Sequence, residues 1–415
     1  MSSKQPDKVC GLFILRIHYI MFEKIVLRRS ELGHELSLGE LAEALLFYQN
    51  VHIILDRGTL ITLSKSIGFN GLISLLSRPN VSAVYIEEQL GTYTTHAAVQ
   101  HHSFQSFYLS GHQDIGALKS KNERLEYSLT SVGFDKKTTH KFVDKFKQLV
   151  PFKKFSDDYY LPGGIIKAAV EDLKDEKFIH EAMRRVLSTN EGVDSVLGDF
   201  RFEVMTNESG FYIFTNIDFA SINKKRKPIN NQKNDLTEAH LISEILTTRA
   251  DIALAAHYGG EFYTSNLSSE IIRLRYKELI KRIGIETEEI KQWQNIVISD
   301  APQIKEVINA QERTFTEFLK LLDKSQKFRD WIQAVNPDEK IVHAYLKDVT
   351  KEGWSEKIPS KILRYLMSTA IDLNNPLLEK AISIADTFFL DKLLKGWRPN
   401  HFVENQLLPF VDMEK

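Results

Sequence analysis

Cysteine is almost missing from this chain, whose 415 residues include a single one, Cys10. One thiol cannot form an intramolecular disulfide, and a cysteine-based zinc site would lack its further ligands. Cys10 lies among apolar residues, where a buried and inert thiol is expected. So little cysteine fits a reducing compartment, and we predict a cytoplasmic protein.

Long apolar runs and a surplus of charge are missing as well. The closest approach to a membrane span, residues 377–394, carries several charged side chains, so no transmembrane helix is predicted. Lys and Arg number 54 and Asp and Glu 55, which leaves no long-range field to attract nucleic acid. Nucleic-acid binding is therefore possible but not indicated. With only 11 proline and 20 glycine residues, long disordered tracts are not expected.

The first twenty residues predict little structure. Val9–Leu15 is apolar, but an arginine follows it and no small-residue cleavage site is present, which disfavours a secretory signal. Both Met1 and Met21 are compatible with the start of the protein. If Met21 is the start, residues 1–20 are a dispensable extension with little role in the fold.

Several widespread catalytic motifs are absent. The sequence contains no G-x-x-x-x-G-K-[ST], no G-x-G-x-x-G, no G-x-S-x-G and no C-x-x-C. These absences disfavour a P-loop ATPase, a dinucleotide enzyme, an α/β-hydrolase and a zinc finger. No cofactor is evident from the remaining pattern.

The most informative stretch predicts a strand, a helix and a second strand. Val51–Leu55 is a short apolar run, residues 59–76 have a helical pattern, and Val81–Ile86 is rich in β-branched and aromatic residues. Two parallel strands joined by a crossover helix end at the same edge of a sheet, where ligands of open α/β sheets bind. Asp56 and Glu87–Glu88 follow these strands, so we expect them to face one crevice.

Carboxylates at strand ends suggest one kind of chemistry. Asp56, Glu87 and Glu88 are candidate ligands of Mg²⁺ or Mn²⁺, because hard cations prefer oxygen ligands. His96 is a candidate base beside them. The histidines that follow the second strand are His96, His101 and His102. A metal-dependent phosphodiesterase or nuclease is the function that this arrangement would support.

A simpler interpretation of the same residues needs no metal. Asp56 is a preferred helix N-cap residue, and Gly58 eases the turn that follows it. Glu87 and Glu88 would then only solubilise a loop. A zinc site is disfavoured, because no H-E-x-x-H occurs and adjacent histidines point to opposite faces of a strand.

The predicted fold class is α+β and mainly helical, in three regions. Residues 1–116 form a small α/β domain, residues 117–223 form helices with a β-hairpin, residues 224–235 form a polar linker, and residues 236–415 form a helical domain. Ser37–Glu40 has the spacing of a capping box, which predicts a helix through Tyr48. Alternation around Asn207–Gly210 predicts the hairpin, and its return strand, Phe211–Phe214, is apolar on both faces, so we expect both to be covered.

Two features of the helical region have alternative interpretations. His240, Glu244 and Asp251 share one helical face, which is either a base-and-ligand group or simply the solvated face; the second interpretation is favoured. Trp397 and Phe402 either fold back onto the helices, which is favoured, or form an exposed anchor for a partner.

Taken together, the missing motifs and the many amphipathic helices predict a cytoplasmic interaction or regulatory protein. Its expected partner is a protein that docks on the helical C-terminal half. The alternative is the metal-dependent phosphodiesterase, in which Asp56, Glu87 and Glu88 bind Mg²⁺ or Mn²⁺.

Overall fold

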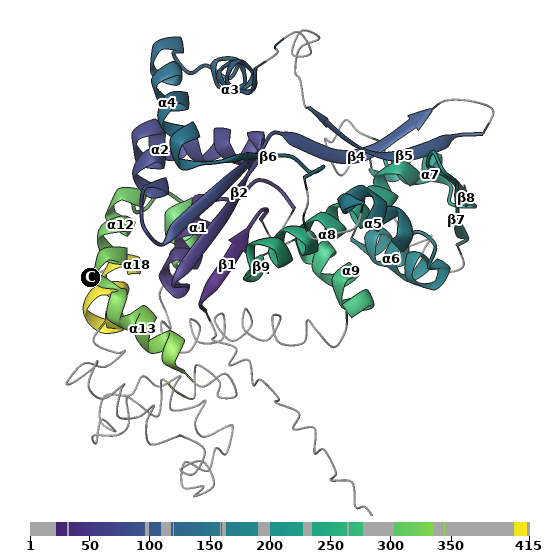
Figure 1. Cartoon of the computed structure of the whole chain (residues 1–415). Coiled ribbons are helices and arrows are strands. Elements are labelled where there is room, and N and C mark those ends of the chain that lie inside the picture. The colour runs from purple at the N-terminus through teal and green to yellow at the C-terminus, as the bar shows by residue number, and fades with distance from the viewer. Residues whose placement is uncertain are drawn as a thin grey trace, which may run out of the picture.

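The architecture is known from a computed structural model (Figure 1). Its strands form two sheets, and its helices pack against both. The structure describes residues 22–30, 33–95, 99–108, 118, 120–157, 159, 163–189, 200–226, 235–263, 265–276, 303–335, 344 and 402–412.

A five-stranded parallel sheet forms the centre. Its strands are β1 (Lys24–Leu27), β2 (Asn50–Leu55), β3 (Val81–Ile86), β6 (Phe152–Lys153) and β9 (Glu261–Tyr263), in the order β6-β3-β2-β1-β9. All neighbours are parallel. The central strands are nearly continuous apolar runs, as expected of strands that are buried on both faces. The predicted strand–helix–strand unit is confirmed as β2, α2 and β3.

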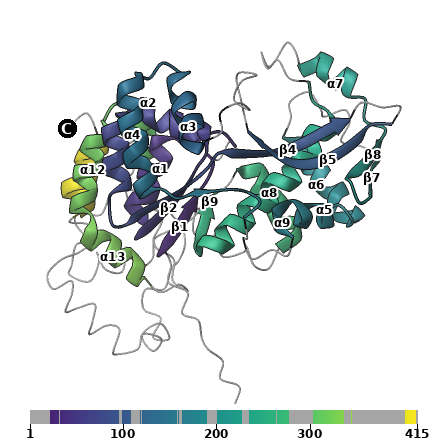
Figure 2. The ribbon, with the colours of Figure 1, turned by 45° about the horizontal axis from the view of Figure 1, so that its top comes forward.

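The helices that connect the strands cover both faces of this sheet. The chain builds β1, β2, β3 and β6 outward in one direction, so right-handed crossovers place their helices on one face. These helices are α1 (Leu38–Phe47), α2 (Arg57–Leu76) and α4 (Lys136–Leu149). The chain then returns to the other side of β1, and α8 (Glu238–Tyr258) lies on the opposite face. Figure 2 shows the two groups of helices on opposite sides of the sheet.

A second sheet is antiparallel and has four strands. It contains β4 (Glu88–Thr95), β5 (His101–Tyr108), β8 (Phe211–Thr215) and β7 (Phe202–Thr206), in the order β4-β5-β8-β7. The predicted hairpin is confirmed as β7 and β8. One face packs into a core together with α5 (Gly164–Asp172), α6 (Glu176–Ser188), α7 (Phe219–Arg226) and α8.

Helices from the C-terminal part pack against α1. They are α11 (Ile304–Asn309), α12 (Phe315–Lys324) and α13 (Gln326–Ala334), with the π-helical turn η4 (Val403–Leu407) and α18 (Leu408–Val411) beside them. Gly39 allows the close approach of α11, since a Cβ atom there would lie 2.3 Å from the Lys305 carbonyl oxygen. The ring of Phe402 stacks on Phe328 at 4.8 Å, so the predicted fold-back is confirmed for Phe402. Trp397 lies outside the described residues.

The structure confirms the predicted fold class, a mixed α and β fold that is mainly helical. The predicted capping box is present, because the Glu40 backbone N–H donates to Ser37 Oγ and the Ser37 N–H donates to the Glu40 carboxylate. The helices α3 (Lys121–Thr130) and α9 (Asn266–Tyr276) complete the described fold. Each of the two cores contains residues from more than one predicted region, and the domain boundaries stay a prediction.

Helix α2 is the one described helix that is long and apolar enough to cross a membrane. A single helix of this kind is weak evidence, because core helices of other proteins meet the same criterion. Gly68 interrupts α2 with a φ of 68°. Leu60, Leu63 and Leu72 of α2 are buried in the same core as the apolar side chains of α1. The described residues therefore contain no clear membrane-spanning segment.

A buried histidine lies within the parallel sheet. His52 of β2 is 6% exposed, and its Nδ1 lies 2.8 Å from Ser82 Oγ of β3. Its ring stacks on Tyr258 with 3.9 Å between the centroids. Burial, together with the nearby charge of Lys24, lowers the pKa of His52 from 6.5 to about 4.

We expect His52 to make the protein sensitive to acid. Between pH 6.5 and pH 4 the unfolded chain binds a proton at this histidine and the folded chain does not, so the free energy of unfolding falls as the pH falls. The expected loss is about 2 kcal/mol at pH 5 relative to pH 7.5. Urea unfolding of wild type and His52→Gln at both pH values measures it. His140→Gln is the matched control because His140 is exposed. An equal loss in all three proteins would contradict the prediction.

Candidate functional site

The carboxyl edge of the parallel sheet brings the predicted acidic residues near one another. In the strand register Leu27 lies beside Ile53, and Leu55 lies beside Tyr85. Arg28, Asp56 and Glu87 therefore follow neighbouring strands at one edge, as the parallel arrangement predicts. Their side chains, however, have different partners.

Asp56 is the N-cap residue of α2. Its Oδ1 accepts a hydrogen bond of 2.7 Å from the Thr59 backbone N–H. This contact satisfies one of the N–H groups that a helix leaves unpaired at its start. The N-cap interpretation of Asp56 is therefore confirmed.

Glu87 forms a bidentate ion pair with Arg124 of α3. Arg124 Nε donates to Glu87 Oε1 at 2.7 Å, and Arg124 Nη2 donates to Oε2 at 2.9 Å. The hydrogen bond to Glu87 raises the pKa of Arg124. The guanidinium also lies over the ring of Tyr108, with 4.9 Å to the centroid. Both oxygens of Glu87 are used by this pair.

Glu88 begins β4 and is buried. Its Oε2 accepts a hydrogen bond of 2.9 Å from the Phe155 backbone N–H, and its Oε1 accepts a longer one of 3.4 Å from the Tyr108 hydroxyl. The expectation that Glu87 and Glu88 only solubilise a loop is wrong, since both carboxylates hold parts of the fold together.

His101 and His102 lie away from the carboxyl edge of the parallel sheet. His96 lies outside the described residues. His101 and His102 belong to β5, where they pair with Thr95 and Thr94, at the opposite end of the hairpin from Glu88. His102 is buried, and burial lowers its pKa. Its Nδ1 lies 3.0 Å from Thr94 Oγ1.

The proposed metal site gains no support from these contacts. Among the described residues, no group of three or more histidine, cysteine, aspartate and glutamate side chains is arranged to hold a metal ion. Asp56 caps a helix, and Glu87 and Glu88 bind protein groups. The use of Mg²⁺ or Mn²⁺ by Asp56, Glu87, Glu88 and His96 stays a prediction.

A buried ion pair at the same edge was not predicted. Arg28, directly after β1, pairs with Asp251 of α8, and its Nη1 also donates to the Thr247 carbonyl oxygen at 3.3 Å. Its guanidinium lies over the Phe155 ring at 5.3 Å. The expectation that Asp251 belongs to a solvated face is wrong, because the α8 turn that carries it packs under β1. His240, in contrast, is exposed.

Arg29 and Glu244 lie beside this ion pair, and each is half-buried. Burial and the charge of Arg28 lower the pKa of Arg29, while the charges of Asp251, Asp56 and Glu244 oppose that shift. Burial raises the pKa of Glu244, and the charge of Arg29 opposes it. Paired arginines directly after a strand were the signal in the sequence that could have indicated this cluster.

The antiparallel sheet has an uncovered face among the described residues. We call it the outer sheet face and define it by Tyr93, Phe107, Tyr212, Phe214 and Met205. Their positions in the register, with alternate side chains on opposite faces, place them on the side away from the core. Four of them are exposed, Met205 by 61% and Tyr93 by 57%. The expectation that both faces of the return strand are covered is therefore wrong at Phe214.

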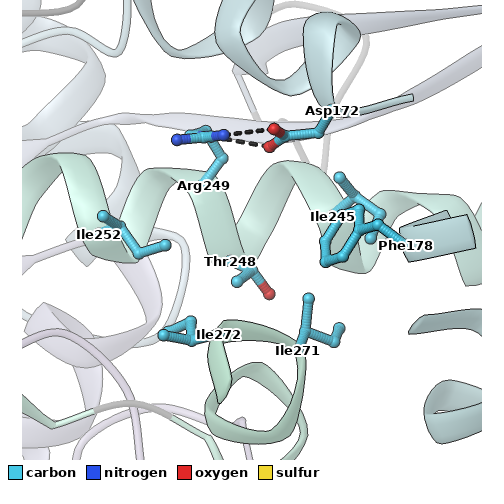
Figure 3. A pocket seen from close by; sticks show the side chains of 8 residues that line it. All are labelled: Asp172, Phe178, Ile245, Thr248, Arg249, Ile252, Ile271 and Ile272. Atoms are coloured by element: carbon cyan, nitrogen blue, oxygen red, sulfur yellow. Dashed lines mark hydrogen bonds and ion pairs between the residues drawn. The ribbon is translucent and has the colours of Figure 1, made fainter. Parts of the chain in front are cut away.

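A small pocket lies between α5, α6, α8 and α9 (Figure 3). Five apolar side chains line it, together with Thr248 and the ion pair of Asp172 and Arg249. The Thr248 hydroxyl is buried and has no hydrogen-bond partner among the described residues. The space is about that of one water molecule, which is too little for a substrate.

Comparison with protein-family models, curated proteins and solved structures finds no match for this chain. The function is therefore inferred from the outer sheet face and the carboxyl edge of the parallel sheet.

Proposed function

We propose that this chain is an interaction or regulatory protein that recognises a protein partner through the outer sheet face. One observation carries the proposal. The described residues expose seven large hydrophobic side chains, and six of these lie in or beside the antiparallel sheet. Four of the six, Tyr93, Phe107, Met205 and Phe214, lie on the outer sheet face, and Val99 and Tyr108 lie outside it. Such a concentration of apolar surface is typical of an interaction site.

The charge of the face favours a protein over nucleic acid. Glu203 of β7 is its charged residue within the described strands, and it pairs at 2.6 Å with Arg201, which directly precedes β7. A phosphate backbone would need cations that are free to neutralise it. The cores of protein interfaces, in contrast, are poor in charge and rich in aromatic residues and methionine. The chemistry of the outer sheet face matches the second description.

The C-terminal helices were expected to hold the partner. In the described part of that region, α11, α12 and α13 bury their large apolar side chains in the core around α1. Docking on the remainder of the C-terminal half stays a proposal. The exposed apolar side chains of the described residues support the sheet as the first place to test.

Substitution of the two most exposed hydrophobic side chains of the outer sheet face tests the proposal. We expect Tyr93→Ser/Met205→Ser to remove a crosslinked partner that the wild-type chain captures in the cells that produce it. Both side chains face solvent, so the melting temperature should change by less than about 2 °C. Leu149→Ser is the control, because Leu149 is an exposed hydrophobic residue of α4. An unchanged set of partners for the double variant would overturn the proposal.

A further inference from the structure

The parallel sheet has a topological switch point between β1 and β9. The chain adds strands on one side of β1 up to β6 and then places β9 on its other side. In open parallel sheets, the crevice outside the carboxyl ends of the strands at this point is the usual ligand site. The loops that follow the two strands meet there, since a Cβ atom on Gly33 would lie 3.6 Å from Ser265 Cβ.

Two neighbouring arginines at this crevice differ in their contacts. Arg28 binds Asp251 and the Thr247 carbonyl, so its guanidinium is used by the fold. No hydrogen bond or ion pair to the Arg29 guanidinium is formed within the described part of the chain, although Arg29 is half-buried. A guanidinium has five N–H donors, and no nitrogen of Arg29 is among the buried atoms without a partner, so its donors are open to solvent and to a ligand. A bound ligand would satisfy them.

The charges around Arg29 indicate the sign of that ligand. Asp251 is neutralised by Arg28, and the Asp56 carboxylate accepts the Thr59 N–H at the start of α2. Burial raises the pKa of Glu244, and the charge of Arg29 opposes that shift. Arg57 adds a second cation at the start of α2, and its Nε is buried without a partner among the described residues. Arg29 and Arg57 are thus the groups at this edge whose donors lack protein partners among the described residues, and both are cations, so an anion is the ligand that would complete them.

We propose that the crevice at the carboxyl ends of β1 and β9 binds a phosphate-bearing small molecule through the guanidinium of Arg29. The planar guanidinium fork matches two phosphate oxygens and forms charge-assisted hydrogen bonds with them. Arg57, one strand away, offers a contact to a second anionic group. Glu244 offers an oxygen to a hydroxyl group of the same ligand. This site is separate from the outer sheet face, so each proposal can be tested without the other.

Calorimetric titration of the full chain with pyrophosphate at low salt tests the proposal. We expect wild type to bind with a dissociation constant below about 1 mM. Arg29→Ala should weaken binding by about tenfold or more, because the charged fork is lost. Arg201→Ala is the matched control, since Arg201 is exposed and directly precedes β7 of the other sheet. Acetate and citrate titrations distinguish a phosphate site from a general carboxylate site.

Arg29→Lys tests the same contact in case Arg29→Ala fails to fold. It keeps the charge and loses the fork, so it should fold like wild type by circular dichroism and bind pyrophosphate more weakly. Absence of pyrophosphate binding by wild type would overturn the proposal. Equal binding by Arg29→Lys, Arg201→Ala and wild type would also overturn it, as would binding of acetate or citrate as tightly as pyrophosphate.

Discussion

Replacing Asp172 by alanine is expected to lower the free energy of unfolding by about 3–5 kcal/mol. Asp172 at the end of α5 holds Arg249 of α8 through two hydrogen bonds, of which that from Arg249 Nε to Oδ2 measures 2.8 Å (Figure 3). The carboxylate is buried and the guanidinium nearly so. Removing the carboxylate leaves the positive charge of Arg249 in a poorly solvated place, and that cost makes the effect large.

Urea unfolding followed by circular dichroism measures the effect. The neighbouring residue supplies the control, because Glu171 pairs with Lys174 at 2.7 Å and both side chains are more than half exposed. Glu171→Ala should change the free energy of unfolding by less than about 1 kcal/mol, as exposed pairs do. A similar small loss for both variants would show that the Asp172–Arg249 pair does not hold α5 against α8.

Trp331→Ala is expected to destabilise the protein by about 3–5 kcal/mol and to lower its solubility. Trp331 is 3% exposed and packs beside Phe328, with 5.9 Å between the ring centroids. Phe328 and Ile332 are buried in the same core. Alanine would leave a large cavity between α13 and α1, in a core that cannot collapse fully around it.

Thermal and urea unfolding of Trp331→Ala measure this cost. Lys327→Ala, one turn earlier on the exposed side of α13, is the matched control and should be nearly neutral. A soluble Trp331→Ala protein with wild-type stability would mean that this face of α13 does not support the core. It would then favour α13 as a surface for a partner.

Local features of the structure followed from local sequence rules. Ser37 and Glu40 form the predicted capping box, and Asp56 caps α2, because such contacts involve residues only three positions apart. The hairpin at Asn207 was predictable because its turn chemistry is local. Among the candidate site residues, the placement of Asp56 and Glu87 after parallel strands also followed from pattern alone.

The partners of those side chains were not predictable in this way. Glu87 binds Arg124, and Glu88 binds the Phe155 backbone, through contacts that bridge 37 and 67 residues of chain. Such pairings depend on which elements become neighbours in space. The sequence pattern of a single strand or helix does not contain that information, and this is why a metal site was an alternative interpretation of these carboxylates.

By itself the sequence determined the mixed α and β class, the strand–helix–strand unit and the caps and turns, because periodicity and capping are short-range properties. Only the tertiary structure decided that β9, three residues long, joins the sheet beside β1, since so short a strand is stabilised by its neighbours rather than by its own residues. Only the tertiary structure decided that Asp251 is buried against Arg28. A charged side chain is buried when a partner neutralises it, and here that partner lies 223 residues away in the chain.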